Sequence, residues 1–453
     1  MSLPFLEGLD AEVDVDPRRC GRGALDFGRL VRTVPRAIVR PRSKAAVCEL
    51  VAACAREGVP LSARGQGHSG FGQSQSAGVV VDMSTLSRIH AIGDGFARVD
   101  AGCTWTAILD AALSGAAPQA PPVITGYSRL SVGGTLSVGG MSGMAFAAGP
   151  QVQHVTELEV VTGEGRVVTC SEAQERRLFE AVLAGQGQCG IILEATLALA
   201  PAKPRTREYT IMYRSAAELL EAMEALLDAA VAGGGRALDV VWGAAVQTPS
   251  GWMFPLIANA HYAPGEEPDP SALFAPIRLP QPPVEDDLSY RGYFDKLDRQ
   301  VSAIATGPDR YPLWLDVFLP AAATAGYVAQ ALGEARPDDY GQGGVCLLFP
   351  LDRRASTRPL LRLPEGARSY LFDYCRNTDP IPRPKAEELL ARNKALYARA
   401  LGLGGTIYPI GAMRMSAEEH RAHYGDAFER FAEDKRAYDP RGILGTGVPI
   451  FGA

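Results

Sequence analysis

The feature that most constrains this chain is a stretch of small residues at 131–150, SVGGTLSVGGMSGMAFAAGP. Glycine, serine and alanine make up most of the stretch, and no single helix or strand needs so many small side chains. Small side chains let a backbone lie close to a neighbouring group, because they leave free the space that a larger residue would fill. The stretch therefore predicts a backbone segment that passes close to something bulky.

A second glycine-rich segment, GQGHSG at 65–70, has the spacing G-x-G-x-x-G. In a dinucleotide-binding turn, the last glycine opens a helix whose N-terminus faces the pyrophosphate. Here the loop FGQSQSAG follows instead, and a second match at 185–190 lies after a predicted helix and before a predicted strand. We therefore exclude a Rossmann turn at both positions. Two interpretations of 64–70 stay open: a nest of backbone N–H groups that binds phosphate, or an ordinary tight turn.

His68 lies inside this loop, between Gly67 and Ser69. Such small neighbours cannot bury an imidazole ring, so we expect it either to face solvent or to point at a ligand. The other histidines form no metal-binding motif such as HExxH. His420 and His423 lie on a predicted charged helix, which predicts that both face solvent.

Helix and strand patterns alternate along the whole chain. Apolar residues at helical spacing, followed by Gly58, predict a helix over 44–57. The segments VPLSA, GVVVDM and FARVDAG predict strands, and VTELEVVTGEGRVVTC predicts a β-hairpin. The character of the chain changes after residue 204, where strands accompany predicted helices at 215–231 and 384–401 and a Pro-rich loop at 264–284. We therefore predict a mixed fold of helices and sheets with a boundary near residue 204.

Composition narrows the classes of function. The 453 residues include 45 Lys and Arg against 51 Asp and Glu, which gives a net charge of −6. This charge leaves no basic excess to neutralise phosphates, so we expect no nucleic-acid partner. No apolar run approaches the roughly 18 residues of a membrane span, and the acidic N-terminus shows no signal segment, so we expect no membrane partner. The eight cysteines form no CxxC pair, which favours a reducing, cytoplasmic location and predicts no metal site.

A series of segments in fixed order resembles a known family. The segments are PLSARGQGHSGFGQ with GVVVDMSTL, LSVGGTLSVGGMSG, ELEVVTGEGRVVTCS, LFEAVLAGQGQCGII and AEEHRAHYGDAFERFAEDKRAYDPRGIL. The series resembles the PCMH-type FAD-binding flavoproteins of the vanillyl-alcohol oxidase superfamily, and within it the cytokinin dehydrogenases. It covers most of residues 35–451. The resemblance implies an α+β fold in two domains: an FAD-binding domain from 1–204 plus 405–453, and an α/β substrate domain from 205–404.

The resemblance also implies FAD as the cofactor and how it is held. In this family the histidine of the Gly-His-Ser loop is joined covalently to the flavin, which implies that role for His68. The glycine loop and the small-residue stretch would lie against the cofactor. By the same matching, the other implied FAD contacts are Ala63, Arg64, Gly65, Gln66, Gly67, Ser69, Gln73, Ser131, Gly133, Gly134, Thr135, Ser137, Met141, Ile192 and Tyr408.

The chain departs from the cytokinin dehydrogenases at Gly126, in ITGYSRLSVGGT. The family carries at this position an aspartate that accepts the amine proton, and glycine cannot act as a base. The resemblance therefore implies a covalent-FAD oxidoreductase that takes hydride from a C–N or C–O carbon of a small-molecule substrate and passes electrons to oxygen or another acceptor. The departure implies that it is not a true cytokinin dehydrogenase. The alternatives are a tailoring enzyme of natural-product biosynthesis, which performs cyclisation or multi-step oxidation, and a catalytically silent flavin-binding protein.

The second half of the chain offers candidates for a base that replaces the aspartate. The strand PLWLDVFLP alternates, so Trp314, Asp316 and Phe318 share one face. A carboxyl group in so apolar a strand is either paired with an arginine or a backbone N–H, or faces the flavin as a base. Asp373 and Tyr374 point to opposite faces of the strand YLFDYC, so at most one of them lines the site. The predicted catalytic candidates are Asp316 and Tyr374, with Asp373 as a further choice.

Overall fold

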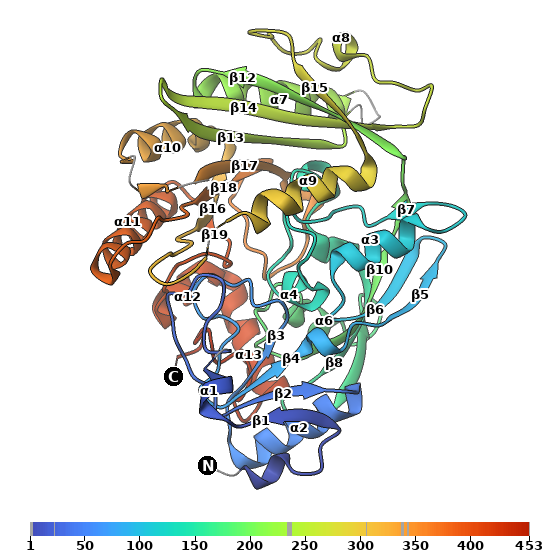
Figure 1. The fold of residues 1–453 in the computed structure, drawn as a ribbon, viewed down its shortest axis with the longest axis vertical. Helices are drawn as coiled ribbons and strands as arrows, with labels where there is room; N and C mark the ends of the chain where they lie inside the picture. The colour runs from blue at the N-terminus through green and yellow to red at the C-terminus, as the bar shows by residue number, and fades with distance from the viewer. Residues whose placement is uncertain are drawn as a thin grey trace.

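The computed structural model describes residues 3–21, 23–232, 238–304, 306–336, 339–341 and 344–452. Its sheets form two regions, one above the other in Figure 1. The lower region holds a four-stranded sheet and a five-stranded sheet near the N-terminus, and the upper region holds one eight-stranded sheet. Helices accompany the sheets in both regions, so the α+β fold is confirmed.

The four-stranded sheet has the order β1-β2-β4-β3, in which β2 and β3 run parallel to β4 and β1 runs antiparallel to β2. Helix α2 (Lys44–Glu57) packs on this sheet through a buried apolar stripe. The Ser43 side chain caps its start, and Gly58 ends it with a φ of 62°. The helix predicted at 44–57 is therefore confirmed with both ends. The elements are η1 (Pro4–Leu6), β1 (Ala11–Asp14), α1 (Pro17–Cys20), β2 (Ala37–Pro41), β3 (Leu61–Arg64), β4 (Val79–Asp82) and η2 (Met83–Thr85).

The five-stranded sheet has the order β5-β6-β10-β8-β9 and is antiparallel throughout. Strands β8 and β9 form the hairpin predicted from the sequence. Helices α3, α4 and α6 pack against this sheet and share one core cluster with it. The elements are β5 (Ile89–Gly93), β6 (Phe96–Asp100), α3 (Trp105–Leu113), β7 (Gln119–Ala120), α4 (Val132–Leu136), α5 (Ala145–Ala148), η3 (Gln151–His154), β8 (Val155–Val161), β9 (Val167–Ser171), α6 (Arg176–Val182), β10 (Ile191–Ala198) and β11 (Ala200–Pro201).

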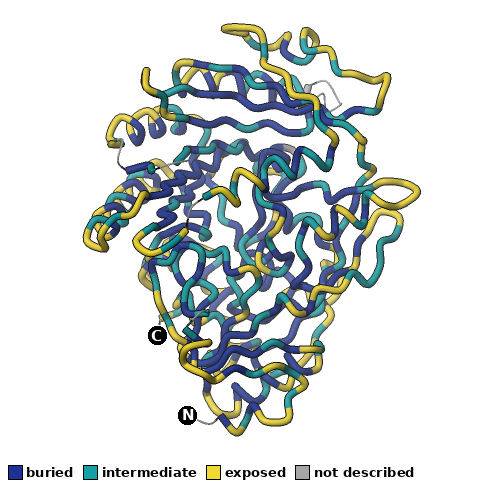
Figure 2. The backbone as a smooth tube through the Cα atoms, in the orientation of Figure 1, coloured by how far each residue is buried: buried dark blue, intermediate teal, exposed yellow. Residues whose placement is uncertain are grey.

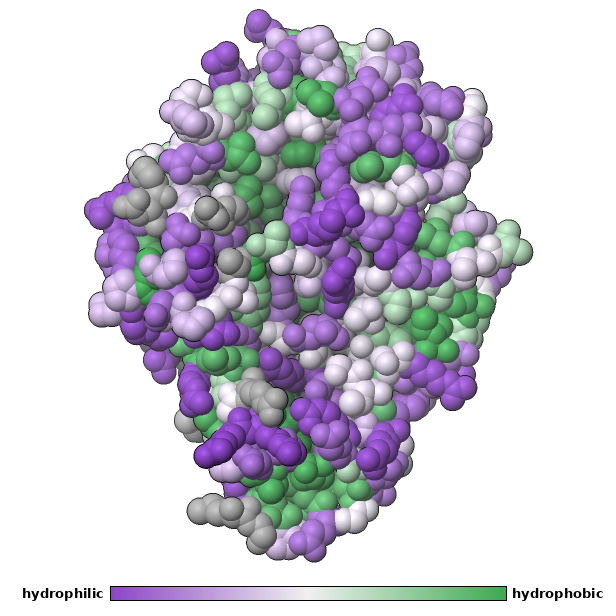
Figure 3. Space-filling model, viewed as in Figure 1, coloured by the Kyte–Doolittle hydropathy of each residue, from purple (hydrophilic) through white to green (hydrophobic). Residues whose placement is uncertain are grey.

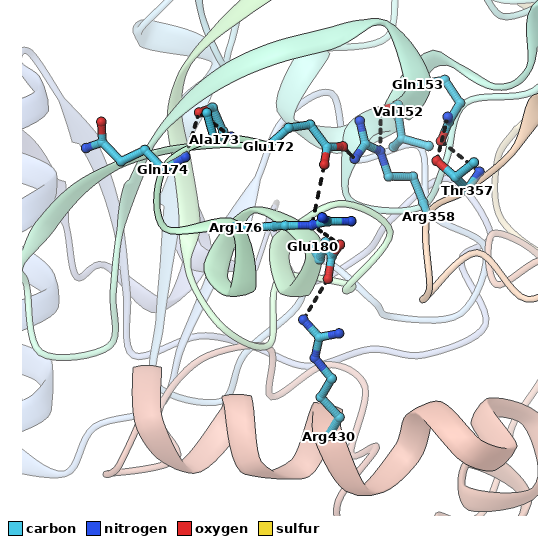
Figure 4. A network of polar contacts seen from close by, with 11 residues as sticks. Val152, Gln153, Glu172, Ala173, Gln174, Arg176, Glu180, Thr357, Arg358 and Arg430 are labelled. Atoms are coloured by element: carbon cyan, nitrogen blue, oxygen red, sulfur yellow. Dashed lines mark hydrogen bonds and ion pairs between the residues drawn. The ribbon is translucent and has the colours of Figure 1, made fainter.

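A polar network fastens the C-terminal end of the chain to the lower region (Figure 4). Glu180 of α6 binds Arg430 of α13 (Phe428–Tyr438) at 2.6 Å and Arg176 at 2.8 Å. Glu172 pairs with Arg176 and with Arg358, whose Nε donates to the carbonyl oxygen of Val152 at 2.9 Å. The segment that follows the upper sheet therefore returns to the lower region. It holds α12 (Ala417–Tyr424), η6 (Gly425–Ala427) and α13.

The eight-stranded sheet has the order β15-β12-β14-β13-β17-β18-β16-β19. Helices α7, α10 and α11 cover one face, where they share a core cluster with the sheet. The opposite face turns toward the lower region, and Figure 2 shows most of these strands as buried. The elements are β12 (Arg205–Tyr213), α7 (Ala216–Ala232), β13 (Val240–Thr248), β14 (Gly251–Tyr262), α8 (Pro270–Leu273), β15 (Val284–Ser289), α9 (Tyr290–Ser302), β16 (Leu315–Pro320), α10 (Ala321–Gly333), β17 (Val345–Asp352), η5 (Arg353–Ala355), β18 (Arg368–Cys375), α11 (Arg383–Gly402) and β19 (Thr406–Ile407).

The helix α9 was not predicted from the sequence. It follows the Pro-rich loop and lies between the eight-stranded sheet and the lower region (Figure 1). The residues Tyr290, Tyr293 and Phe294 of α9 are buried in the core cluster of the lower region. The helix therefore joins the two regions. The domain boundaries at 204 and 404 stay predictions, and the upper sheet extends from Arg205 to Ile407.

The outer face drawn in Figure 3 is largely hydrophilic, with hydrophobic side chains gathered at its lower end near β1 and β2. Within the described residues, no helix has both the length and the apolar character needed to span a bilayer.

Candidate functional site

A cavity of about 770 Å³ lies between the two regions. Its lower wall comes from the glycine loop, α4 and the segments at 186–192 and 444–445, and its upper wall comes from the inner face of the eight-stranded sheet and α9. This volume is typical of small-molecule and cofactor sites. The predicted FAD contacts that line it are Ala63, Gly65, Gln66, Gly67, His68, Ser69, Gln73, Ser131, Gly133, Gly134, Thr135, Ser137, Met141, Ile192 and Tyr408.

The glycine loop packs tightly because two of its glycines leave no room for a side chain. A Cβ on Gly65 would overlap Ser131 Oγ, and a Cβ on Gly67, which has a φ of +67°, would overlap the Arg64 guanidinium. Arg64 does not line the cavity. Its guanidinium instead donates to two carbonyl oxygens of the segment 23–25 at 3.1 and 2.9 Å. The cradle is thus formed by bare backbone, which a large cofactor can approach closely.

Asp26 holds the glycine loop from behind. Its Oδ2 accepts hydrogen bonds from Ser69 Oγ at 2.9 Å and from the Gly72 N–H at 2.5 Å. The carboxyl group is almost fully buried, and this burial raises its pKa, which the hydrogen bonds partly offset. The carbonyl oxygen of Gly67 also accepts a hydrogen bond from the N–H of Phe27 at 2.9 Å. Sequence analysis missed Asp26, because the partners that give it a role lie some forty residues away.

His68 lies in the cavity wall, among aromatic rings. Its imidazole stacks on Phe27 with ring centroids 4.0 Å apart, and the rings of Tyr127 and Trp314 lie at 5.1 and 6.0 Å. Burial lowers the pKa of His68 to about 4. The imidazole is therefore uncharged at neutral pH, with one ring nitrogen carrying a free lone pair.

The small-residue stretch forms the floor beside the loop. Gly133 lies against Ala101, where a Cβ would meet the Ala101 side chain at 3.0 Å. Gly140, with a φ of +76°, donates its N–H to the Tyr408 hydroxyl oxygen at 2.9 Å. Tyr408 follows β19 in the chain, so this bond ties the end of the upper sheet to the lower wall. The backbone is closely packed at these positions, and the glycines leave room that fits a flat cofactor; that the stretch lies against a bulky group stays a prediction.

The upper wall is largely apolar and was not predicted. The rings of Trp242 and Phe349 lie with centroids 6.0 Å apart. Sequence analysis named none of these residues, although α9 carries a detectable signal: Ser289 caps its start, and apolar residues follow at helical spacing. The apolar residues of this wall are Trp242, Ala244, Val246, Pro255, Ile257, Tyr293, Phe294, Leu297, Val301, Ile304, Val345, Leu347, Phe349 and Leu371.

The three candidate bases lie at different depths. Asp373 of β18 lines the cavity, whereas Asp316 of β16 lies outside the lining and is 1% exposed. The two aspartates are cross-strand partners on one face of the sheet. Tyr374 points to the other face, where it packs in the core at 5.1 Å from the ring of Tyr340. The structure therefore brings Asp373 to the cavity, places Asp316 directly beside it, and keeps Tyr374 away from it.

Gly126 lies on the cavity wall, in a loop that α9 holds in place. Asp298 of α9 accepts hydrogen bonds from the Ser128 N–H and from Ser128 Oγ, both at 2.7 Å. No atom beyond its chain neighbours lies within 4 Å of the Cβ position at Gly126. The loop would therefore accept a side chain at this position without moving.

The prediction that His420 and His423 face solvent was wrong. The two residues are 4% and 6% exposed, because the helix α12 packs these side chains against the body of the protein. Burial lowers the pKa of His420 to about 4 and that of His423 to about 3.

Comparison with known proteins places the chain in a family. Residues 35–171 match the family described as "FAD binding domain", and residues 281–451 match "Cytokinin dehydrogenase 1, FAD and cytokinin binding". Cytokinin dehydrogenase 5 of Oryza sativa subsp. japonica is 34% identical over 497 residues, covering 97% of this chain and 91% of that protein. An uncharacterized oxidoreductase of the fasciation locus of Rhodococcoides fascians is 31% identical over 427 residues, covering 93% and 95%. The chain is an FAD-dependent oxidoreductase that belongs to the cytokinin dehydrogenase family.

Proposed function

We propose that this chain carries FAD covalently on His68 and oxidises a small molecule at a carbon bonded to nitrogen or oxygen. When bound, FAD supplies two-electron redox chemistry by accepting a hydride, and oxygen or another acceptor takes the electrons on as second substrate. The observation that carries the proposal is the cavity between the two regions, in which the backbone cradle and the largely apolar wall face each other. The cradle suits the cofactor, and the apolar wall suits an organic substrate.

His68 supports the covalent attachment. Its ring lies in the wall of the cradle, and its burial keeps the imidazole neutral, which leaves a nucleophilic nitrogen available. In a denaturing gel, the wild-type band should show flavin fluorescence, and His68→Ala should lose it while still binding FAD. His90→Ala is the matched control, because His90 pairs with Asp100 outside the cavity. Release of all flavin from the wild type on acid precipitation would refute the attachment.

Oxidation is tested by the flavin spectrum. We expect some members of a panel of aromatic amines and alcohols to bleach the bound flavin under anaerobic conditions, and air to restore it. A panel that binds without bleaching would instead favour the silent binding protein considered from the sequence.

We further propose that N6-isoprenoid adenines are poor substrates, although several relatives are named cytokinin dehydrogenases. The aspartate expected to accept the amine proton is replaced by Gly126, and loss of a general base typically lowers rates by about 10²–10⁴-fold. Isopentenyl adenine should therefore reduce the flavin slowly. Gly126→Asp, which has open space for its side chain, should speed that reduction. Rapid reduction of wild-type flavin by isopentenyl adenine would overturn this part.

The glycine at position 126, where the family has an aspartate, also supports a second candidate function. This function is a tailoring reaction of natural-product biosynthesis, by cyclisation or multi-step oxidation. Product analysis separates the two functions. Simple oxidation gives one product that is two electrons more oxidised than the substrate, whereas tailoring gives a cyclised or further oxidised product. All eight cysteines are free thiols, which supports the proposal of a reducing, cytoplasmic location.

A further inference from the structure

Asp373 holds a singular position in the cavity. Among the described residues that line it, Asp373 is the only Asp, Glu, Lys or Arg. The other residues of the upper wall carry no charge, since most are apolar and Gln300 and Asn377 are neutral amides, and the ionisable His68 on the lower wall is neutral at physiological pH. A substrate that enters this space therefore meets one carboxyl group and no cationic side chain of the described lining.

The carboxyl group of Asp373 does not stand alone. Asp316 lies directly across from it on the neighbouring strand, with the two Cα atoms in register. Asp316 is fully enclosed, and neither of its side-chain oxygens receives a hydrogen bond from an N–H, O–H or S–H donor of the described residues. The Cys375 thiol donates to Asp373 Oδ1 at 3.0 Å. A proton held between the two carboxyl groups would give Asp316 the partner that it otherwise lacks.

The burial of Asp316 and Asp373 favours a proton shared between their carboxyl groups. Burial raises the pKa of both aspartates, and for Asp316 the neighbouring charge of Asp373 adds to this effect. The more enclosed Asp316 is thus the group that keeps its proton. A protonated Asp316 donates to Asp373, and this hydrogen bond favours the ionised form of the carboxyl group that faces the cavity.

We propose that Asp373 is the proton acceptor for the oxidised substrate, and that Asp316 is a positioning residue that presents it. The proposal rests on the proposed function. In the balanced step, the substrate C–H bond breaks and both its electrons leave as hydride to the bound flavin. The substrate N–H or O–H proton passes to the Asp373 carboxylate, and a C=N or C=O bond forms. Reoxidation by oxygen or another acceptor removes the two electrons, and the proton returns to solvent with the product.

The same geometry narrows the substrate class. The upper wall offers an apolar surface with aromatic rings, so the body of the substrate is apolar. Its polar group is an amine or a hydroxyl that can donate a hydrogen to Asp373. A substrate carboxylate or phosphate would meet Asp373 with no Lys or Arg of the described lining to offset the repulsion.

Three other titratable groups face this pair. Cys375 lies beside Asp373 on β18, Cys346 lies on β17, and Tyr408 comes from the segment after β19. Burial raises the pKa of each, and the two aspartates raise the pKa of Tyr408 further. All three therefore stay neutral at physiological pH, so among these groups only the carboxyl pair can carry charge.

Infrared spectroscopy of the holoenzyme tests the pair without any substrate. The wild type should show the C=O stretch of a protonated carboxylic acid at pH 7. Asp316→Asn should abolish this band, and Asp373→Asn should shift it, because the hydrogen-bond acceptor changes. Asp352→Asn is the matched control, since it lies at the end of β17 outside the cavity lining and pairs with Arg354. A wild-type spectrum without such a band, or a band that survives in Asp316→Asn, would overturn the shared proton.

Anaerobic flavin reduction tests the proton acceptor, with benzylamine and benzyl alcohol as the first probes. Asp373→Asn should slow reduction by about 10²–10⁴-fold with flavin content unchanged. Asp316→Asn, whose amide N–H still donates, should stay within a few fold, whereas Asp316→Ala should move the acid limb of the pH profile to higher pH. An unchanged rate in Asp373→Asn would exclude it as the acceptor. If no amine or alcohol of the panel reduces the flavin of the wild type, the proposed function fails. The infrared result still tests whether Asp316 and Asp373 share a proton.

Discussion

The two walls of the cavity differ in whether backbone or side chains form their characteristic surface. The lower wall contains a backbone cradle, in which Gly65, Gly67 and Gly133 leave no space for larger side chains. The upper wall consists of side chains that several strands and α9 bring together. A backbone cradle tolerates almost no substitution, whereas a wall of side chains can be repacked one residue at a time. We therefore expect the lower wall to hold the proposed FAD and the upper wall to set which substrate is accepted.

The largest effect is expected from a substitution that displaces the glycine loop of the lower wall. A Cβ on Gly28 would overlap the backbone oxygen of Gly70, which cannot rotate away, so Gly28→Ala must shift the glycine loop. We expect the free energy of unfolding to fall by about 1–3 kcal/mol, as in other overpacked sites, and the flavin content to fall with it. Denaturant unfolding and the ratio of flavin to protein absorbance measure the two changes.

Gly326→Ala is the matched control for that prediction. Gly326 lies within α10, with no atom near its Cβ position, so the same substitution should stabilise the protein by roughly 0.5–1 kcal/mol. If both variants changed stability and flavin content alike, the close packing of Gly28 against Gly70 would not be what holds the flavin and stabilises the protein.

A smaller effect is expected where the two walls meet. Asp298→Asn weakens the two hydrogen bonds that hold the loop carrying Gly126, at a cost of about 1 kcal/mol. Because this loop lines the cavity where α9 of the upper wall meets the lower region, we expect KM to rise more than kcat falls, with flavin content unchanged. Asp295→Asn on the same helix, which removes a surface pair with Arg291, is the control and should change neither. Loss of flavin in Asp298→Asn would show that the two walls are not separable at this point.

The smallest effect concerns pH, where His68 on the lower wall and Asp316 behind the upper wall should shift stability with opposite sign. The pKa of His68 is lowered from 6.5 to about 4, so the folded protein binds fewer protons than the unfolded chain in this window, and stability falls as the pH drops through it. The pKa of Asp316 is raised above 3.8, so its contribution to stability falls as the pH rises above that value. His68→Phe should flatten the acid side of the stability profile, and Asp316→Asn should flatten the alkaline side. Denaturant midpoints between pH 4 and pH 9 check both slopes, and identical profiles for the two variants would contradict the assignment.

The walls also differ in how far the sequence predicts them. The helix over 44–57 and the close packing of the small-residue stretch follow from neighbouring residues, because caps and glycine conformations are local properties. The contacts of Asp26 with the glycine loop and of Asp298 with Ser128 join residues far apart in the chain, so no local pattern reveals them. The side chains of the upper wall depend on strand register, and only α9 carried a local signal that sequence analysis overlooked.

The hydrogen bonds from Ser128 to Asp298 have a consequence for exchanging parts between relatives. One side of this contact lies on α9, next to the upper sheet, and the other lies on a loop of the lower region, so the boundary drawn by sequence cuts through it. A chimera that replaces residues 205–404 alone would combine an α9 and a loop that never evolved together. A functional chimera would have to take the loop at 124–130 and α9 from the same parent protein.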